Sequence, residues 1–426
     1  MLPSNNPKLK SWIEVSPESN FPIQNLPFGI FKTKEILPRV GVAIGDFIID
    51  LAELKKLGVF NALNFDTQVF AKPYLNDFIS LGKKTTRAVR ERISKLLQER
   101  NPELRDNLKA REKVFHKIKE VEMLLPVRIG DYTDFYSSME HATNVGSMFR
   151  DPKNALLPNW KHLPVAYHGR ASSILVSGED IYRPNGQTKA DEVEFPSFGP
   201  TKQLDFELEL AFITHQGKPL GQNISTKEAE DYIFGLVLFN DWSARDIQKW
   251  EYVPLGPFLS KNFASSISPW VVTMDALEPL KIAGPDQFPE VLPYLKFEGN
   301  NNFDITLEVY IKPENSNETL VSKTNSKFLY WNMAQQLAHH TINGCNINSG
   351  DLMASGTISG PTPDSYGSML ELAWKGTKPL KLISGEERKF IHDHDTVIFR
   401  GYGEINGIRI GFGELKSKVL PSITPK

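Results

Sequence analysis

The sequence contains very little cysteine. Cys345 is the only one among 426 residues, so no disulfide bond can form within the chain. A composition of this kind is typical of proteins in a reducing compartment, and we therefore expect a cytoplasmic protein. A chain of this length buries enough apolar surface to fold without such cross-links.

Long hydrophobic runs and an excess of one charge are also lacking. The longest apolar run, near residues 233–239, is far shorter than the ~20 residues that cross a membrane. The first ten residues lack the apolar stretch of a secretory signal. Lys and Arg total 49 against 51 Asp and Glu, which gives a net charge of -2. We expect neither a membrane partner nor a protein that binds polyanions over its whole surface.

One segment departs from this balance of charge. Residues 83–119 contain 13 basic and 5 acidic side chains, with Val89, Ile93 and Leu96 at helical spacing. The segment is either a nucleic-acid surface or a pair of solvated amphipathic helices divided by Pro102. No aromatic or glycine-rich recognition pattern accompanies the charge, so we favour the helices and expect no nucleic-acid partner.

Turns and short strands dominate what remains. Glycine and proline number 29 each, and short strands are predicted at residues 28–31, 39–43 and 47–50. Beyond residue 126 strands prevail, including a buried one at 232–239, a hairpin over 396–411 and one clear helix at 332–343. We predict a mainly β chain with an N-terminal domain at 1–126 and a larger domain at 127–426.

Acidic residues alternate with apolar ones in the strand predicted at 204–212. The side chains of Asp205, Glu207 and Glu209 share one face of that strand. Like charges on one face repel each other, so the pattern indicates either a solvated edge strand or a bound cation.

A second polar segment follows the buried strand directly. If residues 241–252 are helical, Asp241, Arg245, Gln248 and Tyr252 share one face. A stripe of a carboxylate, a guanidinium, an amide and a phenol packs poorly in a core and is typical of a functional site. A structural salt bridge between Asp241 and Arg245 is the alternative.

A third segment, residues 130–146, brings Asp134, Tyr136 and His141 close together in the sequence, with Arg150 beyond. Asp134 joins Glu207, Glu209 and Asp241 in an all-carboxylate set. Such a set favours a hard cation, which is calcium, magnesium or manganese, and disfavours zinc. Residues 356–360 resemble a nucleophile elbow with Ser359 displaced by one position, and we expect a turn there.

These segments together resemble the fumarylacetoacetate hydrolase family over nearly the whole chain. The motifs that carry the resemblance are residues 134–136, 141–144, 164–171, 205–209, 239–248, 256–261 and 355–361. Together with the N-terminal region, they resemble the long members of that family more than the shorter acylpyruvase-type relatives.

The resemblance implies a fold and an activity. It implies a small Src-homology-like β-barrel followed by a large mixed β-sandwich roll, assembled as a homodimer. It also implies metal-dependent hydrolysis of a carbon–carbon bond in a small diketo acid, 4-fumarylacetoacetate, giving fumarate and acetoacetate at the end of tyrosine and phenylalanine catabolism. Another metal–enolate activity, such as acylpyruvate hydrolysis or decarboxylation, is the alternative within the family.

The resemblance also implies roles for individual residues. His141 is the base that activates water, and Glu371 orients it. Developing negative charge is stabilised by Arg245, Gln248 and Lys261. Substrate is held by Tyr136, Arg150, Tyr167, Gln248, Tyr252 and Thr357. The Ca2+ ligands are Asp134, Glu207, Glu209 and Asp241.

A second cation, Mg2+, is implied at Asp241, Lys261 and Ser265. The family pattern after residues 261–263 is Gly then Thr, whereas this chain has Ala264 and Ser265. Ser265 keeps the hydroxyl group. Met139 and Glu140 also differ from the family pattern, and Glu140 adds a charge beside His141.

Overall fold

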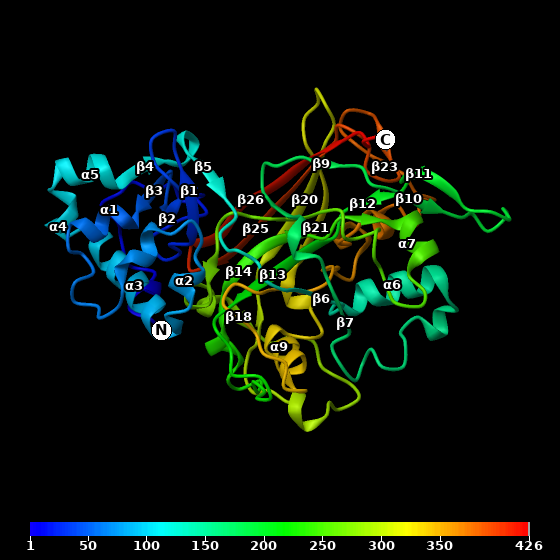
Figure 1. Ribbon diagram of the computed structural model, residues 1–426, viewed down its shortest axis with the longest axis horizontal. Coiled ribbons are helices and arrows are strands. Elements are labelled where there is room, and N and C mark those ends of the chain that lie inside the picture. Colours follow the sequence, from blue (N-terminus) through cyan, green and yellow to red (C-terminus); the bar gives the residue numbers. More distant parts are fainter. Residues whose placement is uncertain (425–426) are drawn as a thin grey trace.

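The fold was analysed in a computed structural model that describes residues 1–424. Figure 1 shows an N-terminal part, blue to cyan, beside a larger part that contains most of the strands. The chain is mainly β, as predicted. Its helices are short apart from α3, α6 and α9, and their bounds are α1 Leu51–Lys56, α2 Asn76–Ile79, α3 Gly82–Leu97, α4 Pro102–Arg105, α5 Leu108–Val114, α6 Met139–Phe149, α7 Arg245–Glu251, α8 Met274–Leu277, α9 Met333–Thr341 and α10 Met369–Leu372.

The N-terminal part contains a five-stranded antiparallel sheet in the order β4-β3-β2-β1-β5. Its strands are β1 Phe28–Lys32, β2 Arg39–Ile44, β3 Phe47–Asp50, β4 Phe115–Lys117 and β5 Glu122–Leu124. The three strands predicted from the sequence are confirmed. Gly45, with φ of 54°, makes the turn that joins β2 to β3. The closure of these strands into a Src-homology-like barrel stays a prediction.

The basic segment is helical, but the prediction of two helices is wrong. Three helices, α3, α4 and α5, occupy it, because the side chain of Asn107 caps a separate helix α5 after Pro102 has begun α4. Basic side chains from α3 reach the larger part. Lys83 pairs with Asp231 at 2.8 Å, and Arg87 pairs with Asp275 at 2.6 Å.

An eight-stranded mixed sheet forms the centre of the larger part, in the order β7-β6-β22-β13-β14-β16-β8, with β17 also paired to β14. Its strands are β6 Tyr132–Phe135, β7 Ala166–His168, β8 Ile174–Val176, β13 Leu208–Thr214, β14 Ile233–Asn240, β16 Ser265–Ile267, β17 Val272–Thr273 and β22 Leu352–Ala354. Every residue of β14 is buried, which confirms the prediction of a strand covered on both faces.

A second five-stranded sheet covers one face of this central sheet, in the order β21-β20-β25-β26-β9. Its strands are β9 Ile181–Tyr182, β20 Thr306–Lys312, β21 Thr319–Asn325, β25 Thr396–Ile405 and β26 Ile408–Leu420. The predicted hairpin is confirmed, with Asn406 and Gly407 both at positive φ in its turn. Short pairs complete the larger part: β10 Asn185–Thr188 with β11 Ser197–Pro200, β12 Leu204–Asp205 with β15 Ser243–Ala244, β18 Lys281–Ile282 with β19 Asn302–Phe303, and β23 Leu380–Lys381 with β24 Glu387–Arg388.

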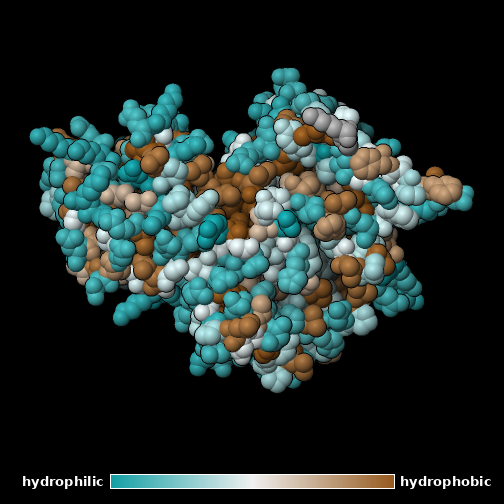
Figure 2. All heavy atoms as spheres, in the orientation of Figure 1, coloured by the Kyte–Doolittle hydropathy of each residue, from teal (hydrophilic) through white to brown (hydrophobic). Residues whose placement is uncertain are grey.

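Alternate side chains of β14 enter two different cores. Leu236 and Leu238 pack among residues of the second sheet, such as Phe399. Val237 and Phe239 pack in a core that contains the N-terminal strands and α3. This is the alternation of a strand between two covering layers. Figure 2 shows apolar side chains where the N-terminal part meets the rest. The domain division at 126/127 stays a prediction, since one continuous core crosses it.

Helix α9 confirms the predicted helix near 332–343. The side chain of Asn332 caps its first turn, and Gln335 completes a capping box. Met333, Leu337, Ala338 and Thr341 are buried on its inner face. Cys345, the single cysteine, is half-buried. Within residues 1–424, none of the helices has the length and apolarity to span a bilayer.

The shared core predicts that the two parts unfold together. Phe234 of β14 is 3% exposed, and its ring lies 5.9 Å from that of Phe28 and 6.0 Å from that of Phe78. We expect Phe234→Ala to lower the free energy of unfolding by about 3–5 kcal/mol, because it leaves a cavity in the joint core.

The measurement is guanidinium chloride unfolding followed by circular dichroism and tryptophan fluorescence. Both probes should give one coincident transition, shifted in the variant. Phe195→Ala is the control, because that ring is 73% exposed and its removal should change little. Two separate transitions, with only one of them moved, would contradict the shared core.

Candidate active site

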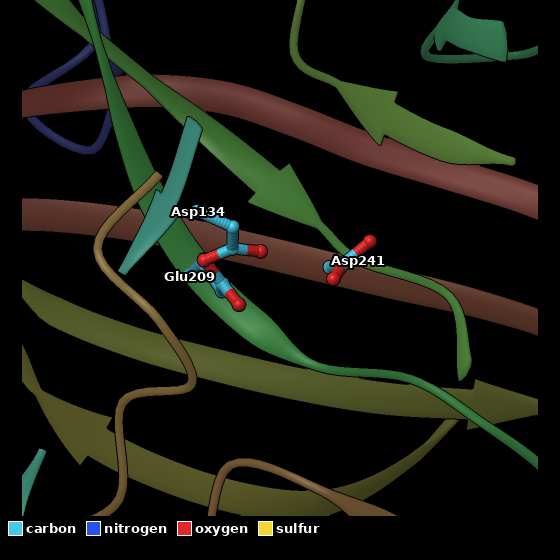
Figure 3. Close-up of side chains that lie close together, drawn as sticks. All are labelled: Asp134, Glu209 and Asp241. Atoms are coloured by element: carbon cyan, nitrogen blue, oxygen red, sulfur yellow. The ribbon is translucent and has the colours of Figure 1, made fainter. Parts of the chain in front are cut away.

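Three buried carboxylates from three strand ends lie together (Figure 3). Asp134 belongs to β6, Glu209 to β13, and Asp241 follows β14. One oxygen from each lies within 4.8 Å of the others. Strand register brings them together: Leu208 pairs with Asn240, and Asp134 pairs with Ala354 of β22, which in turn pairs with Ala211 of β13. We call this group the carboxylate cluster.

The carboxylate cluster carries unbalanced negative charge. Asp134 Oδ1 and Glu209 Oε1 are buried without a hydrogen-bond partner among the described residues. Burial and, after it, the charge of Asp241 raise the pKa of Asp134 well above its usual range. Burial and the charges of Asp134 and Glu207 do the same to the pKa of Glu209. An oxygen-only donor set with two unused buried oxygens fits a hard divalent cation.

The backbone N–H of Gly356 donates to Glu209 Oε2 at 2.9 Å, and hydroxyl groups hold oxygens of Asp134 and Asp241. Tyr132 donates a hydrogen bond to Asp134 Oδ2 at 2.7 Å, and Tyr167 donates to Asp241 Oδ2 at 2.6 Å. Ser265, the first residue of β16, donates to Asp241 Oδ1 at 3.1 Å. Two of the sequence candidates, Tyr167 and Ser265, therefore contact a cluster carboxylate directly.

Glu207, the fourth predicted metal ligand, lies beside the cluster and is held by two cations. Arg245 Nη2 donates to Glu207 Oε1 at 2.7 Å, and Lys261 Nζ donates to Glu207 Oε2. Burial alone would raise the pKa of Glu207, but the charges of Lys261 and Arg245 lower it well below the usual value. Lys261 Nζ also donates to Asp241 Oδ2 at 2.6 Å, so this ammonium group joins Glu207 to the cluster.

The solvated edge strand considered for residues 204–212 is wrong. Asp205, Glu207 and Glu209 are all buried, because β13 lies inside the central sheet and β12 is covered. Asp205 is not part of the cluster. Its carboxylate accepts a hydrogen bond from Arg245 Nε at 2.8 Å and others from the backbone N–H groups of Met369 and Leu370.

The predicted helical stripe from Asp241 to Tyr252 is also wrong at its start. Helix α7 begins only at Arg245, since Ser243 and Ala244 are extended in β15. Asp241 therefore points into the cluster, and the alternative salt bridge to Arg245 is replaced by pairs with Asp205 and Glu207. Gln248 does lie beside Arg245 on α7, with Arg245 Nη1 donating to its Oε1 at 3.2 Å.

A buried imidazole and carboxylate meet next to Glu207. His141 lies in the first turn of α6, which the Ser138 side chain caps, and its Nδ1 is 2.6 Å from Glu371 Oε2 on α10. His141 is 3% and Glu371 1% exposed. His141 Nε2 lies 4.0 Å from Glu207 Oε1. The structure thus places the predicted pair beside the predicted metal ligands.

The remaining candidates divide into buried and exposed groups. The ring of Tyr136 packs edge-on against His141 at 5.3 Å, and Thr357 is buried. Arg150 is exposed and donates to the backbone oxygen of Ala155 at 2.6 Å. Tyr252 is 52% exposed just after α7. These last two lie outside the buried group.

Sequence reasoning missed three contacts of Glu371, one of them with Ser368 Oγ at 2.9 Å. Asn144 Nδ2 donates to Glu371 Oε1 at 2.9 Å, and Ser359 Oγ lies 2.9 Å from both carboxylate oxygens. The spacing of Asn144 from His141, which puts both on one face of α6, is the one signal in the sequence for that contact. The sequence pattern around Ser359 resembles a nucleophile elbow and gave no sign of a contact with Glu371.

The cluster predicts metal binding in competition with protons. Because the pKa values of Asp134 and Glu209 are raised in the fold, the metal-free protein retains protons there as the pH rises above the unfolded-state values. A bound divalent cation displaces those protons, so the stabilisation by metal should grow from pH 5.5 to pH 8. At a concentration 100-fold above Kd it should reach about 2.7 kcal/mol.

Calorimetric unfolding with and without Ca2+ or Mn2+ at both pH values measures this. Asp241→Asn should abolish the metal-dependent increase in Tm. Asp395→Asn is the matched control, because Asp395 is equally buried but paired with Arg388 far from the cluster in the sequence. An equal metal effect in both variants would rule out the cluster as the site.

Comparisons with known proteins identify the family of the chain. Residues 24–126 match the family described as "Fumarylacetoacetase N-terminal", and residues 131–420 match "Fumarylacetoacetate (FAA) hydrolase C-terminal". The fumarylacetoacetase of Dictyostelium discoideum is 58% identical over 97% of this chain and 98% of its own. The fumarylacetoacetase of Homo sapiens is 53% identical over 97% of this chain and 100% of its own.

A solved structure supports the fold. The fumarylacetoacetate hydrolase from psychrophilic Exiguobacterium antarcticum superposes with a TM-score of 0.53 at 18% identity, covering 93% of this chain and 99% of that one. At that identity the likeness concerns the fold alone. On the two family matches and the near-full-length relatives, the chain belongs to the fumarylacetoacetate hydrolase family.

Proposed function

We propose that this protein hydrolyses the carbon–carbon bond of 4-fumarylacetoacetate to give fumarate and acetoacetate, the last step of tyrosine and phenylalanine catabolism. The supporting relatives carry the name fumarylacetoacetase and are 51–58% identical over 97% of the chain. The observation that carries the proposal is the buried His141–Glu371 pair, with His141 Nε2 4.0 Å from Glu207 and Glu207 joined through Lys261 to the carboxylate cluster.

The cation that we propose for the cluster is Ca2+, held by Asp134, Glu209 and Asp241, with Glu207 as the fourth ligand. The two unpartnered oxygens of Asp134 and Glu209 support this assignment. When bound, a divalent cation supplies positive charge that polarises the oxygens of a β-diketone. Each Glu207 oxygen accepts one hydrogen bond, from Arg245 or from Lys261, and keeps a second lone pair for a cation.

A second site for Mg2+ near Asp241, Lys261 and Ser265 is also part of the proposal. The hydroxyl of Ser265 contacts Asp241 and supports it. The side chain of Lys261 contributes to such a site only by fixing Asp241. Burial alone would lower the pKa of this amine, but the charges of Asp241 and Glu207 raise it above the usual value. A protonated amine has no lone pair to offer a cation.

His141 is the base that we assign to the attacking water. If Nδ1–H donates to Glu371 Oε2 at 2.6 Å, Nε2 carries the free lone pair on the side of Glu207 and Arg245. As the imidazole accepts a proton from water, the buried Glu371 carboxylate stabilises the resulting positive charge. The same carboxylate fixes the tautomer and the orientation of the ring.

Arg245, Gln248 and Lys261 stabilise the negative charge that develops on the attacked carbonyl oxygen. Asp205 and Glu207 hold the Arg245 guanidinium in place, so its reorganisation during the reaction costs little. In comparable sites the loss of one such donor costs about 3–4 kcal/mol of barrier.

The substrate-binding residues are assigned by burial as well as by resemblance. Thr357 is buried and Tyr136 is half-buried beside His141, and we assign both to the reacting part of the substrate. Arg150 and Tyr252 are exposed, so they meet the substrate at the entrance, where a guanidinium suits a terminal carboxylate. Tyr167 reaches the substrate only through its contact with Asp241.

A homodimer and a cytoplasmic location complete the proposal. Between α7 and Lys261 a run of apolar side chains is exposed, including Val253 at 66%, Leu255 at 97% and Phe258 at 64%. Such a patch is typical of a protein interface. The single cysteine supports the reducing compartment.

The activity is tested by the loss of diketone absorbance when the purified protein meets 4-fumarylacetoacetate. We expect hydrolysis by the metal-loaded protein, loss of hydrolysis after chelation, and recovery with Ca2+ or Mg2+. Absence of hydrolysis in the metal-loaded protein would contradict the proposal and would direct the assay to shorter diketo acids. Hydrolysis that survives removal of all bound metal would contradict the role of the cation.

His141→Ala should lower kcat by about 100- to 10,000-fold, the range of a lost general base. The metal-dependent increase in Tm should persist, because the cluster lacks His141. His339→Ala is the control. His339 lies on α9, its Nδ1 is hydrogen-bonded to the hydroxyl of Tyr294, and its loss should leave kcat unchanged. A His141→Ala variant with more than a tenth of the wild-type rate would rule out the assigned base.

A further inference from the structure

The hydroxyl group of Ser359 is committed to Glu371. Ser359 is fully buried on the segment after β22, and its Oγ lies 2.9 Å from both Glu371 Oε1 and Oε2. The backbone N–H of Gly367 donates to the same Oγ at 2.9 Å. Because the hydroxyl accepts from the backbone on one side, its single proton is directed to the carboxylate on the other.

This arrangement excludes a nucleophilic role for Ser359, which the elbow-like pattern of residues 356–360 would indicate. A nucleophilic serine needs a base within hydrogen-bond reach that removes its proton and leaves the oxygen open to the substrate. Ser359 Oγ instead lies behind Glu371, on a carboxylate that already accepts a hydrogen bond from His141. The imidazole therefore faces the substrate side and the serine does not.

Ser359 also touches the helix that carries His141. Ser138, whose side chain caps α6 by accepting from the His141 N–H, donates to the backbone oxygen of Ser359 at 3.3 Å and accepts from its N–H at 3.4 Å. The residue thus contacts both halves of the His141–Glu371 pair. Its side chain holds the carboxylate, and its backbone holds the cap of α6.

Four donors surround the Glu371 carboxylate. They are His141 Nδ1 at 2.6 Å and, each at 2.9 Å, Asn144 Nδ2, Ser368 Oγ and Ser359 Oγ. Only the ionised carboxylate accepts all four, because a protonated one must itself donate. Without the hydroxyl of Ser359, the Glu371 carboxylate keeps hydrogen-bond partners on one side only and can rotate away from the imidazole of His141.

We propose that Ser359 is a positioning residue of the reaction: its hydroxyl fixes the ionised Glu371, and through it the orientation of His141 Nε2 toward the attacking water. The inference rests on the proposed function of the same site. Among the described residues, the hydroxyl of Ser359 is hydrogen-bonded to Glu371 and to the Gly367 N–H and to none of the proposed metal ligands.

Other ionisable groups face this pair, and they bear on any pH dependence. Glu140 on α6, Tyr136 before α6 and Tyr366 before α10 all feel the charge of Glu371. Burial alone would raise the pKa of Glu371, while the charge and hydrogen bond of His141 and the other donors lower it. Removing one donor moves that pKa upward, so the acid limb of the rate profile should move to higher pH.

The test compares Ser359→Ala with Ser268→Ala. Ser268 is a matched control, since it is equally buried and also accepts one backbone N–H, from Leu238 at 2.9 Å, but has no contact with Glu371. Ser359→Ala should lower kcat about 10- to 100-fold with KM nearly unchanged, as expected for losing a hydrogen bond to a buried charge. The acid limb of the pH–rate profile of Ser359→Ala should shift to higher pH. Ser268→Ala should show neither effect.

A second readout does not depend on turnover. The His141 Nδ1–H proton in its short bond to Glu371 should give a downfield proton NMR signal, identified by its absence from His141→Ala. Ser359→Ala should shift or broaden this signal, Ser268→Ala should leave it unchanged, and Ser359→Cys, of similar size with a weak donor, should be intermediate.

The two readouts separate the possible failures. Wild-type kcat, pH profile and proton signal in Ser359→Ala would overturn the positioning role. If the wild-type protein does not hydrolyse 4-fumarylacetoacetate but Ser359→Ala still alters the signal, the proposed function fails and the positioning of His141 by Ser359 stands. If Ser359→Ala does not fold, Ser359→Cys decides, and a signal and rate equal to the wild type would overturn the proposal.

Discussion

Burying five carboxylates beside only two cations is the constraint on which the centre of this molecule depends. Asp134, Asp205, Glu207, Glu209 and Asp241 are all nearly inaccessible, and only Arg245 and Lys261 accompany them. Unpaired buried charge is costly, so such a group needs protons or a metal ion. Arg245 and Lys261 neutralise Asp205 and Glu207, and the excess collects on Asp134 and Glu209, whose oxygens lack partners among the described residues.

The fold meets this constraint by separating two kinds of carboxylate. Asp205 and Glu207 contact Arg245 and hold it in position. In the carboxylate cluster, Asp134 and Glu209 each keep one oxygen without a hydrogen-bond partner among the described residues. Lys261 lies between the two kinds and joins Glu207 to Asp241, while Glu207 approaches His141 from the other side. The proposed base, the two fixed cations and the oxygens proposed to bind metal therefore share one buried network. The central sheet supports that network, because the N-terminal part and the second sheet cover its two faces.

Local patterns in the sequence were sufficient for much of this structure. A continuous apolar run predicted β14, and the turn at Asn406 and Gly407 predicted the β25–β26 hairpin. The alternating acidic strand indicated either a cation or a solvated edge. The sequence could not tell which of Asp205, Glu207 and Glu209 faces a cation, because Arg245 approaches from a segment distant in the chain. Asp241 was assigned to a helix that begins four residues later, since the extended pair β12–β15 depends on a partner strand. Ser359 was missed because its contact with Glu371 depends on how two loops pack.

The central claim is that a divalent cation occupies the carboxylate cluster. A crystal of the protein grown with Mn2+, measured at the manganese absorption edge, tests it most directly. The account predicts one strong anomalous peak within about 2.0–2.6 Å of oxygens from Asp134, Glu209 and Asp241, a distance range typical of oxygen ligands. A cluster without such a peak in a protein that retains full hydrolytic activity would contradict the account.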